Sequence, residues 1–373
     1  MTVGIVTMFH KSSNYGGVLQ AYALTKVLAN YGIEAEQIRY NNFSAFSFVR
    51  RMKNNLYRAV MMVKYCKSLR CYLQIRKRKR TVVKAAMQLV PHSRRIYREK
   101  TIGKCLCDYS VYISGSDQVW HGEWPAYFLS FVPGGKRKIA YGVSTGKDRL
   151  SEYDIEQIKG YTKDYTAISV READTADILK AAMPNKSIDV VLDPTMLLDL
   201  EDWNSIVSER KIKGKYLFCY FLGSDIRIRK LAEKYGEDHG LKIVTIPHMQ
   251  GIVEPSDMGF GDVQAYDAVP QDFLSYIKYA NTVFTDSFHA CVFSHIFQRQ
   301  YYVFGRSERR EMNNRIEMLT ALFHTQDHYI YENGDFTITH INKIDTINYA
   351  QKFDDFKGMK EKSRLFLMNA VIN

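Results

Sequence analysis

The sequence predicts an α/β protein with two Rossmann-like domains facing a cleft. Its 373 residues exceed the roughly 250–300 residues at which one hydrophobic core usually stops growing, so two domains are expected. Short apolar runs alternate with segments of helical periodicity, and this pattern is typical of a parallel sheet layered with helices. The alternation occurs in two successive series of similar length.

The first series begins with the apolar run "VGIVTMF" at 3–9, followed by a helix that starts in "NYGG". Leu24, Val27 and Leu28 recur there at helical spacing, and Gly32 ends the helix before the strand-like "IEAEQIRY". We expect further strands at 110–114, 137–144, 165–170 and 188–192, and helices near 151–161 and 172–182.

The second series begins with "KYLFCYFLG" at 215–223. We expect its other strands at 241–246, 282–285 and 300–304, and its helices at 225–239, 270–279 and 287–297. The boundary then falls near 195–214, which gives an N-terminal domain at 1–200 and a C-terminal domain at 210–340. A last helix at 346–373 is expected to pack back on the first domain and complete it.

The net charge of +12 comes from one segment. Residues 50–104 hold 18 Lys and Arg against one acid, Glu99, whereas the rest of the chain holds 34 basic and 39 acidic residues. We expect a basic helical insertion at about 45–104 of the N-terminal domain. Such a helix suits an anionic membrane surface or an anionic polymer, and a solvated helical face is an equally weighted alternative. Nucleic acid is not expected, because no reading module accompanies the charge.

Neither a metal nor a cofactor is expected. The six cysteines lack a CxxC spacing, so we interpret them as reduced thiols outside any disulfide or zinc site. No apolar stretch approaches the ~18 residues of a membrane span, and the first residues are too short and polar for a signal peptide. A cytoplasmic protein is therefore expected, with peripheral contact to the inner membrane face as a further expectation.

Four stretches place polar residues where strands give way to helices. In "NYGGVLQ" (14–20), Gly16 and Gly17 allow close backbone approach, and the helix start offers amide groups to an anion. Asn14 precedes these glycines, and Gln20 should point inward from the first helical turn. A plain turn is the alternative for a Gly-Gly pair.

The stretch "SGSDQVW" (114–120) follows an expected strand. Asp117, between Ser116 and Gln118, could accept a hydrogen bond from a sugar hydroxyl or cap the next helix, which is the commoner role. Trp120 could stack on a sugar face or fill the core. In "SVRE" (169–172), Arg171 leaves a buried-looking strand and suits bidentate binding of a carboxylate or phosphate. An ion pair of Arg171 with Glu172 or another acid is the alternative.

The stretch "TDSFHACVFS" (285–294) places His289 in the first turn of an apolar helix that either Asp286 or Ser287 would cap. We expect a neutral imidazole there, able to take or share a proton. His289 shares a face with Phe293 and Ile296, so a core histidine is the alternative.

In order and spacing, six motifs resemble the polysaccharide pyruvyl transferase family: "NYGGVLQAYAL", "SGSDQVW", "KIAYGVS", "SVREADTADIL", "VLDPTMLL" and "TDSFHACVFSHIF". The likeness runs from residue 3 to about 320 and includes "NNRIEMLTAL" at 313–322. It implies two Rossmann-like domains in a GT-B-like arrangement. It also implies a metal-free enzyme that transfers pyruvate from phosphoenolpyruvate to a sugar as a ketal.

The resemblance gives roles to particular residues. His289 matches the family's essential histidine, Arg171 a donor-binding arginine, and Asp117 an acidic residue near the acceptor. Some members carry a basic residue two places before the histidine, where this chain has Ser287. We therefore expect the donor's charge to be met by arginines that follow, and the candidates are Arg306, Arg309 and Arg315. Lipid-linked saccharides for capsule or exopolysaccharide are the acceptors that the resemblance implies.

Two other functions fit parts of the sequence. A GT-B-like glycosyltransferase using a nucleotide sugar would need an acid for the ribose hydroxyls, and Asp257, Asp262 and Asp267 lie in a suitable loop without a recognisable spacing. A non-catalytic module could bind an anionic polymer or a membrane through residues 50–104.

Overall fold

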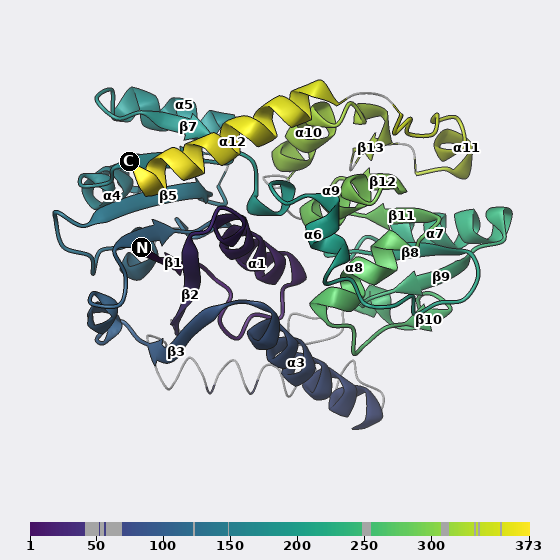
Figure 1. Ribbon diagram of the computed structural model, residues 1–373. Helices are drawn as coiled ribbons and strands as arrows, with labels where there is room; N and C mark the ends of the chain where they lie inside the picture. Colours follow the sequence, from purple (N-terminus) through teal and green to yellow (C-terminus); the bar gives the residue numbers. More distant parts are fainter. Residues whose placement is uncertain are drawn as a thin grey trace. The chain divides into compact units, whose positions relative to one another are not determined.

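The computed structural model describes residues 1–41, 52, 56, 69–121, 124–147, 149–247, 255–306, 313–331, 333–334, 336–350 and 353–373. The chain divides into two compact units, each with its own sheet (Figure 1). Unit 1 comprises Met1–Ala45, Ala85–Asp199 and Asp355–Asn373, and unit 2 comprises Phe46–Lys84 and Leu200–Asp354. Every named strand pair is parallel, so the predicted α/β fold with two Rossmann-like domains is confirmed.

The sheet of unit 1 has the strand order β3-β2-β1-β4-β5-β6-β7. Its strands are β1 (Thr2–Val6), β2 (Glu34–Tyr40), β3 (His92–Tyr97), β4 (Val111–Ser114), β5 (Arg137–Val143), β6 (Ala167–Val170) and β7 (Ile188–Val190). Its helices are α1 (Tyr15–Asn30), α4 (Glu152–Thr162), α5 (Ala173–Ala182) and α12 (Asp354–Ile372), with 3₁₀ turns η2 (Ile102–Cys105), η3 (Pro125–Phe128) and η4 (Pro194–Met196). The central strand β4 is buried along its whole length, as expected for parallel strands covered on both faces.

The sheet of unit 2 has the order β10-β9-β8-β11-β12-β13. Its strands are β8 (Tyr216–Tyr220), β9 (Lys242–Thr245), β10 (Val263–Gln264), β11 (Thr282–Thr285), β12 (Gln300–Phe304) and β13 (Tyr329–Ile330). Its helices are α6 (Leu200–Asn204), α7 (Ile226–His239), α8 (Pro270–Lys278), α9 (Phe288–Ile296), α10 (Asn313–Leu322) and α11 (Ile338–Ile341), with 3₁₀ turns η5 (Pro255–Asp257) and η7 (Gln326–His328).

Each sheet contains one point where the strand order reverses. In unit 1 the reversal lies between β1 and β4, and in unit 2 between β8 and β11. The loops that leave two such strands diverge to opposite sides, and open α/β sheets place their ligands in the resulting space beyond the carboxyl ends. The topology therefore indicates one candidate site in each unit.

The last helix, α12 (yellow in Figure 1), packs on unit 1. The Leu192 amide donates to Ser363 Oγ at 2.9 Å, and Arg364 Nε donates to the Leu197 carbonyl at 2.9 Å. At the far end of the helix, Arg137 Nη1 donates to the Val371 carbonyl at 2.7 Å. The helix begins at Asp354, later in the chain than the expected start at 346.

The basic segment differs from its prediction in two respects. Among the described residues it forms one helix, α3 (Leu69–Leu89), and then the edge strand β3. The strand was missed because its exposed positions carry Arg94 and Arg95, charges that commonly protect an edge strand from pairing. Phe46–Lys84 also group with unit 2 rather than with the N-terminal domain, and Arg78 Nη1 donates to the Pro247 carbonyl at 2.6 Å.

Candidate functional site

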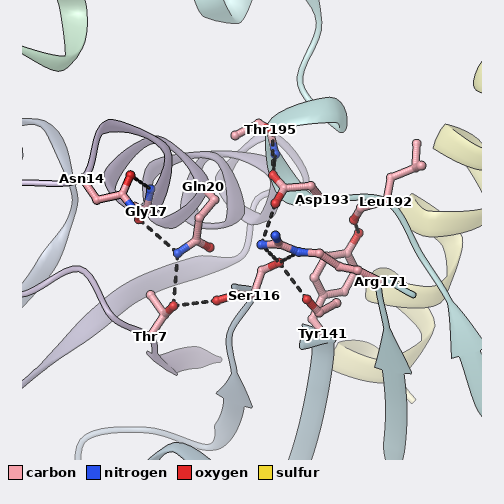
Figure 2. A network of polar contacts seen from close by, with 11 residues as sticks. Thr7, Asn14, Gly17, Gln20, Ser116, Tyr141, Arg171, Leu192, Asp193 and Thr195 are labelled. Atoms are coloured by element: carbon pink, nitrogen blue, oxygen red, sulfur yellow. Dashed lines mark hydrogen bonds and ion pairs between the residues drawn. The ribbon is translucent and has the colours of Figure 1, made fainter. Parts of the chain in front are cut away.

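The first candidate site lies at the switch point of unit 1, where β1 leads into α1 and β4 into the segment 115–120. Four sequence-predicted residues begin α1 or lie in its first turns: Asn14, Gly16, Gly17 and Gln20. Three others follow β4: Ser116, Asp117 and Gln118. Arg171 follows β6, two strands further along the same sheet. Figure 2 shows most of these side chains in one network.

The start of α1 is capped from within. Asn14 is the N-cap residue, and its Oδ1 accepts the amides of Gly16 at 3.1 Å and Gly17 at 3.4 Å. The expectation that these amides face an anion needs correction, because an Asn side chain already satisfies them as N-caps usually do. Gly17 lies close to β4's loop, since a Cβ there would stand 3.5 Å from Asp117 Oδ2.

Gln20 points inward, as the helical spacing predicted. It is fully buried, and its Nε2 donates to Thr7 Oγ1 at 3.1 Å and to the Gly17 carbonyl at 3.0 Å. Thr7 Oγ1 in turn donates to the Ser116 carbonyl at 2.7 Å. This chain of bonds ties α1 to the ends of β1 and β4 (Figure 2).

Asp117 has a left-handed backbone, with φ of 82°. Non-glycine residues rarely adopt this conformation, which costs about 1–3 kcal/mol and concentrates at functional sites. The backbone is held because the Asp117 carbonyl accepts the amides of Val119 at 2.7 Å and Ser144 at 3.0 Å. Its half-buried carboxylate makes no hydrogen bond or ion pair with any described residue. It does act electrostatically on Tyr127, where burial and then the charge of Asp117 raise the tyrosine pKa.

Two residues that follow Asp117 pack within unit 1. Gln118 packs against Gly146, where a Cβ would stand 2.9 Å from Gln118 Cδ, and the φ of 67° at Gly146 separately favours glycine. Trp120 is buried, stacks on Phe128 with ring centroids 5.2 Å apart, and donates from Nε1 to Ser114 Oγ at 3.1 Å. The core-filling alternative for Trp120 is therefore the one observed.

Arg171 is buried in an ion pair. Its Nη2 lies 2.5 Å from Asp193 Oδ2, and the two side chains are 5% and 0% exposed. Its Nε and Nη2 also donate to Ser116 Oγ at 2.9 and 2.6 Å. The sequence anticipated an acid as an alternative partner, but it could not identify Asp193, which lies in the later motif "VLDPTMLL". Within the described residues Nη1 of Arg171 makes no hydrogen bond.

The second candidate site lies at the switch point of unit 2, where α9 begins after β11. Ser287 is the N-cap residue, and its Oγ accepts the Ala290 amide at 3.5 Å. Asp286, the other expected cap, instead accepts the amides of Leu222 and Gly223 at 2.7 Å each. It thereby joins the ends of β8 and β11. His289 is half-buried in the first turn of α9, whereas Phe293 below it is fully buried.

Two of the three expected donor arginines lie beside this helix start. A Cβ on Gly223 would meet Asp286 Oδ2 at 3.1 Å and Arg306 Cδ at 3.5 Å, so these residues are neighbours. Burial raises the pKa of Asp286, against the lowering effects of Arg306 and of the two backbone amides. The Arg306 guanidinium makes no hydrogen bond or ion pair with any described residue. Arg315 Cζ lies 5.8 Å from the ring centroid of Phe288, and Arg309 lies outside the described residues.

Two of the three acids considered for a nucleotide-sugar site already bind other groups of the protein. Asp257 is buried in an ion pair with Arg229 at 2.6 Å. Asp262 Oδ2 accepts the Ile243 amide at 2.7 Å. Of these three, only Asp267 is exposed and makes no hydrogen bond or ion pair with a described residue. The described residues also contain no group of three or more His, Cys, Asp or Glu placed to hold a metal ion.

Comparisons with known proteins agree with this fold. A putative UDP-N-acetylglucosamine 2-epimerase from Listeria monocytogenes is similar in structure, with a TM-score of 0.53, 11% identity, and coverage of 97% of this chain and 90% of the other. The UDP-GlcNAc 2-epimerase of Methanocaldococcus jannaschii has a TM-score of 0.53 at 12% identity, covering 99% of this chain and 100% of the other. At such identities these likenesses concern the fold alone.

A comparison of the sequence with curated proteins finds no match. The sequence pattern of one family, described as polysaccharide pyruvyl transferase, matches residues 14–308. That range begins at the cap of α1 and extends past Arg306, so it includes the starts of α1 and α9 and most of the chain. The chain therefore belongs to the polysaccharide pyruvyl transferase family.

Proposed function

We propose that the protein transfers pyruvate from phosphoenolpyruvate to a sugar of a capsular or other surface polysaccharide precursor, as a ketal, and releases phosphate. Family membership supports polysaccharide pyruvylation in general. The observation that carries the finer proposal is the position of His289, half-buried in the first turn of α9 at the switch point of unit 2. Arg306 and Arg315 lie on the segments that follow.

The donor carries a carboxylate and a phosphate, so its site needs cations. Arg306 supports the proposal most directly, because its guanidinium has no bonded partner among the described residues. Planar guanidinium groups bind such oxyanions through two parallel bonds. Arg306 and Arg315 would thus supply the charge that Ser287 lacks. Arg171 keeps the donor-binding role that the resemblance gives it, through Nη1, the nitrogen that Ser116 and Asp193 leave unused.

The proposed reaction joins two sugar hydroxyls to C2 of the donor. The first hydroxyl adds to C2 while C3 gains a proton and becomes a methyl group. The C–O bond to phosphate then breaks as the second hydroxyl closes the ketal, and its proton leaves with the phosphate. A neutral imidazole at His289 can take the hydroxyl proton and return one to C3. Arginines held in place stabilise the charge that develops, and Asp117 would orient the acceptor.

The test is a screen of donors and acceptors read by mass spectrometry. With phosphoenolpyruvate, we expect the acceptor to gain the mass of pyruvate minus water, with one phosphate released for each product. Release of a nucleoside diphosphate from a nucleotide sugar, without ketal formation, would support the glycosyltransferase alternative and refute this proposal.

We also propose that α3 brings the enzyme to lipid-linked acceptors at an anionic membrane surface. Lys77, Lys79 and Arg80 are exposed on this helix, whereas Arg78 is buried and bonded to Pro247. Each exposed cation close to an anionic leaflet contributes about 1 kcal/mol. Val60, Met61, Met62 and Val63, expected to enter the interface, lie outside the described residues. No helix among the described residues is long and apolar enough to span a membrane.

A further inference from the structure

We infer that Asp193 is a positioning residue for Asp117 and acts through Arg171 and Ser116. The inference rests on the proposed function, in which Asp117 orients the acceptor. Asp193 belongs to the "VLDPTMLL" stretch, which carries the family likeness without a role for any of its side chains. Figure 2 shows Asp193 connected through Arg171 to Ser116 in the β4 loop.

The first link is the buried ion pair of Asp193 with Arg171. Asp193 Oδ2 lies 2.5 Å from Arg171 Nη2, and Asp193 Oδ1 accepts the backbone amide of Thr195 at 2.8 Å and its hydroxyl at 2.6 Å. The carboxylate is thus fixed from two sides at the start of η4. A guanidinium buried against a fixed carboxylate has a single orientation, because leaving either charge unpaired in the interior is strongly unfavourable.

The second link is the bond of Arg171 to Ser116. Two guanidinium nitrogens converge on Ser116 Oγ, and the hydroxyl donates its own proton to the Gly142 carbonyl at 2.9 Å. The Ser116 carbonyl is held separately by Thr7 Oγ1 at 2.7 Å. Ser116 is therefore fixed by its side chain and by its carbonyl, immediately before Asp117.

The third link is the backbone of Asp117. Its φ of 82° is unfavourable for an L-residue and persists only where the surroundings over-determine it. The hydrogen bonds of Ser116 fix the residue just before Asp117. The amides of Val119 and Ser144 fix the Asp117 carbonyl itself. As a result, the Asp117 carboxylate is presented without a bonded partner among the described residues. Asp193 holds this geometry without itself meeting the substrate.

The experiment is a double-mutant cycle on turnover. Asp193→Asn keeps the shape of the side chain but removes its charge, and we expect kcat to fall ~10²-fold, as misplacement of a reacting group by about 1 Å can cause. In the Asp117→Asn background, the same change should cost no more than about threefold, because residues that act as a unit are not additive. A full ~10²-fold loss in both backgrounds, or a loss confined to the donor's KM, would overturn the inference.

Asp257→Asn is the matched control. Asp257 and Arg229 form an equally buried pair in unit 2, 2.6 Å apart and 2% and 3% exposed. Its effect on turnover should be the same factor with and without Asp117→Asn. If Asp193→Asn fails to fold, Ser116→Ala breaks the same connection without leaving a carboxylate unpaired, and it must show the same non-additivity with Asp117→Asn.

Hydrogen exchange gives a readout that does not depend on activity. The amides of Val119 and Ser144 bond to the Asp117 carbonyl, so their exchange should become faster in Asp193→Asn and stay unchanged in Asp257→Asn. Unchanged exchange at both amides would refute the positioning role even if turnover fell. If the wild-type protein transfers no pyruvate in the mass assay, the proposed function fails, and the exchange result still decides the positioning role.

Discussion

His289 and His295 share helix α9, but their surroundings give them different properties. The ring of His295 stacks on Phe323 with centroids 3.7 Å apart, and burial lowers the pKa of His295 to about 3. His289 is half-buried in the first turn, two residues after the N-cap Ser287. His295 is thus a core histidine, whereas the catalytic role of His289 stays a prediction.

Replacing His289 with Ala is expected to abolish transfer while the fold remains intact. Loss of a general acid–base group typically costs ~10²–10⁴-fold in rate, and a half-buried side chain leaves little cavity. Turnover of phosphoenolpyruvate with a sugar acceptor measures the effect, and a thermal melt checks the fold. Near-normal turnover, or an unfolded variant, would indicate that His289 is a structural residue and not a catalytic one.

Arg171→Lys should harm the enzyme almost as much as Arg171→Ala. A lysine can still pair with Asp193, but it cannot place two donors on Ser116 and keep a third nitrogen for the donor. We expect the larger effect on kcat/KM for phosphoenolpyruvate, measured at saturating acceptor. Unchanged donor kinetics would restrict Arg171 to the positioning network.

The sequence could place these residues but not their partners. Asp117, Arg171 and His289 each follow an apolar run, so a parallel sheet puts them at strand ends. Which side chain satisfies which neighbour depends on rotamers and on contacts across the chain. Asp193 and Arg171 meet because β7 lies next to β6, a pairing that no spacing in the sequence reveals. The capping of Gly16 and Gly17 by Asn14 was missed for a related reason, since both a cap and an anion would satisfy those amides.

At the scale of elements, α3 shows how a charged segment can mislead. Its cations indicated one solvated or membrane-bound face, yet Arg78 is buried and bonded to the Pro247 carbonyl. The strand β3 was overlooked in the same segment, because its exposed arginines hide the alternation that Ser93 and Tyr97 retain on the buried side. The buried strands β4, β5, β8 and β11 were found readily, since burial on both faces leaves a largely continuous hydrophobic run.

The membrane proposal can be tested on the exposed positions of α3. Replacing Lys77, Lys79 and Arg80 with Gln should reduce sedimentation with anionic liposomes at low salt, and binding of the wild type should weaken steeply as salt rises. Turnover of a lipid-linked acceptor should fall as well, whereas a short soluble acceptor should be unaffected. Arg78 is left in place, because its loss would disturb the contact with Pro247.

The matched control removes the same charge elsewhere. Lys180 and Lys234 are exposed and Lys159 is half-exposed, and each forms a surface ion pair within its own helix. Such pairs contribute little to stability. Changing these three to Gln should leave liposome binding intact. Equal loss of liposome binding in both triple variants would show that only the net charge of the protein matters. If the wild type does not bind liposomes at all, α3 is a solvated helical face.

At the scale of the whole molecule, buried histidines should make the fold sensitive to acid. Burial, followed by the charges of Lys11, Arg39 and His92, lowers the pKa of His10 to about 4, and burial lowers that of His295 to about 3. The unfolded chain takes up these protons as the pH falls below about 6.5, while the folded chain does not. The unfolded state then binds more protons, so stability is lost as the pH falls from about 6.5 toward these values.

Denaturant unfolding at several pH values measures this effect. The free energy of unfolding should fall by about 1.4 kcal/mol for each pH unit below about 6.5 on account of His295 alone. His295→Gln keeps a neutral polar side chain there and should remove that part of the slope. An identical slope in the variant would show that other groups dominate the acid response.

The three-part composition of unit 1 also has a consequence for how the protein is made. Its last part, α12, supplies Ser363 to the Leu192 amide and Arg364 to the Leu197 carbonyl, yet the ribosome delivers it after all of unit 2. During synthesis, the loop that contains Asp193 therefore lacks its contacts with α12 until that helix has been made. A nascent chain arrested before residue 354 should leave unit 1 open to proteases while unit 2 is already protected. Unit 1, which carries Asp117 and Arg171, would then be completed only after unit 2 has been synthesised.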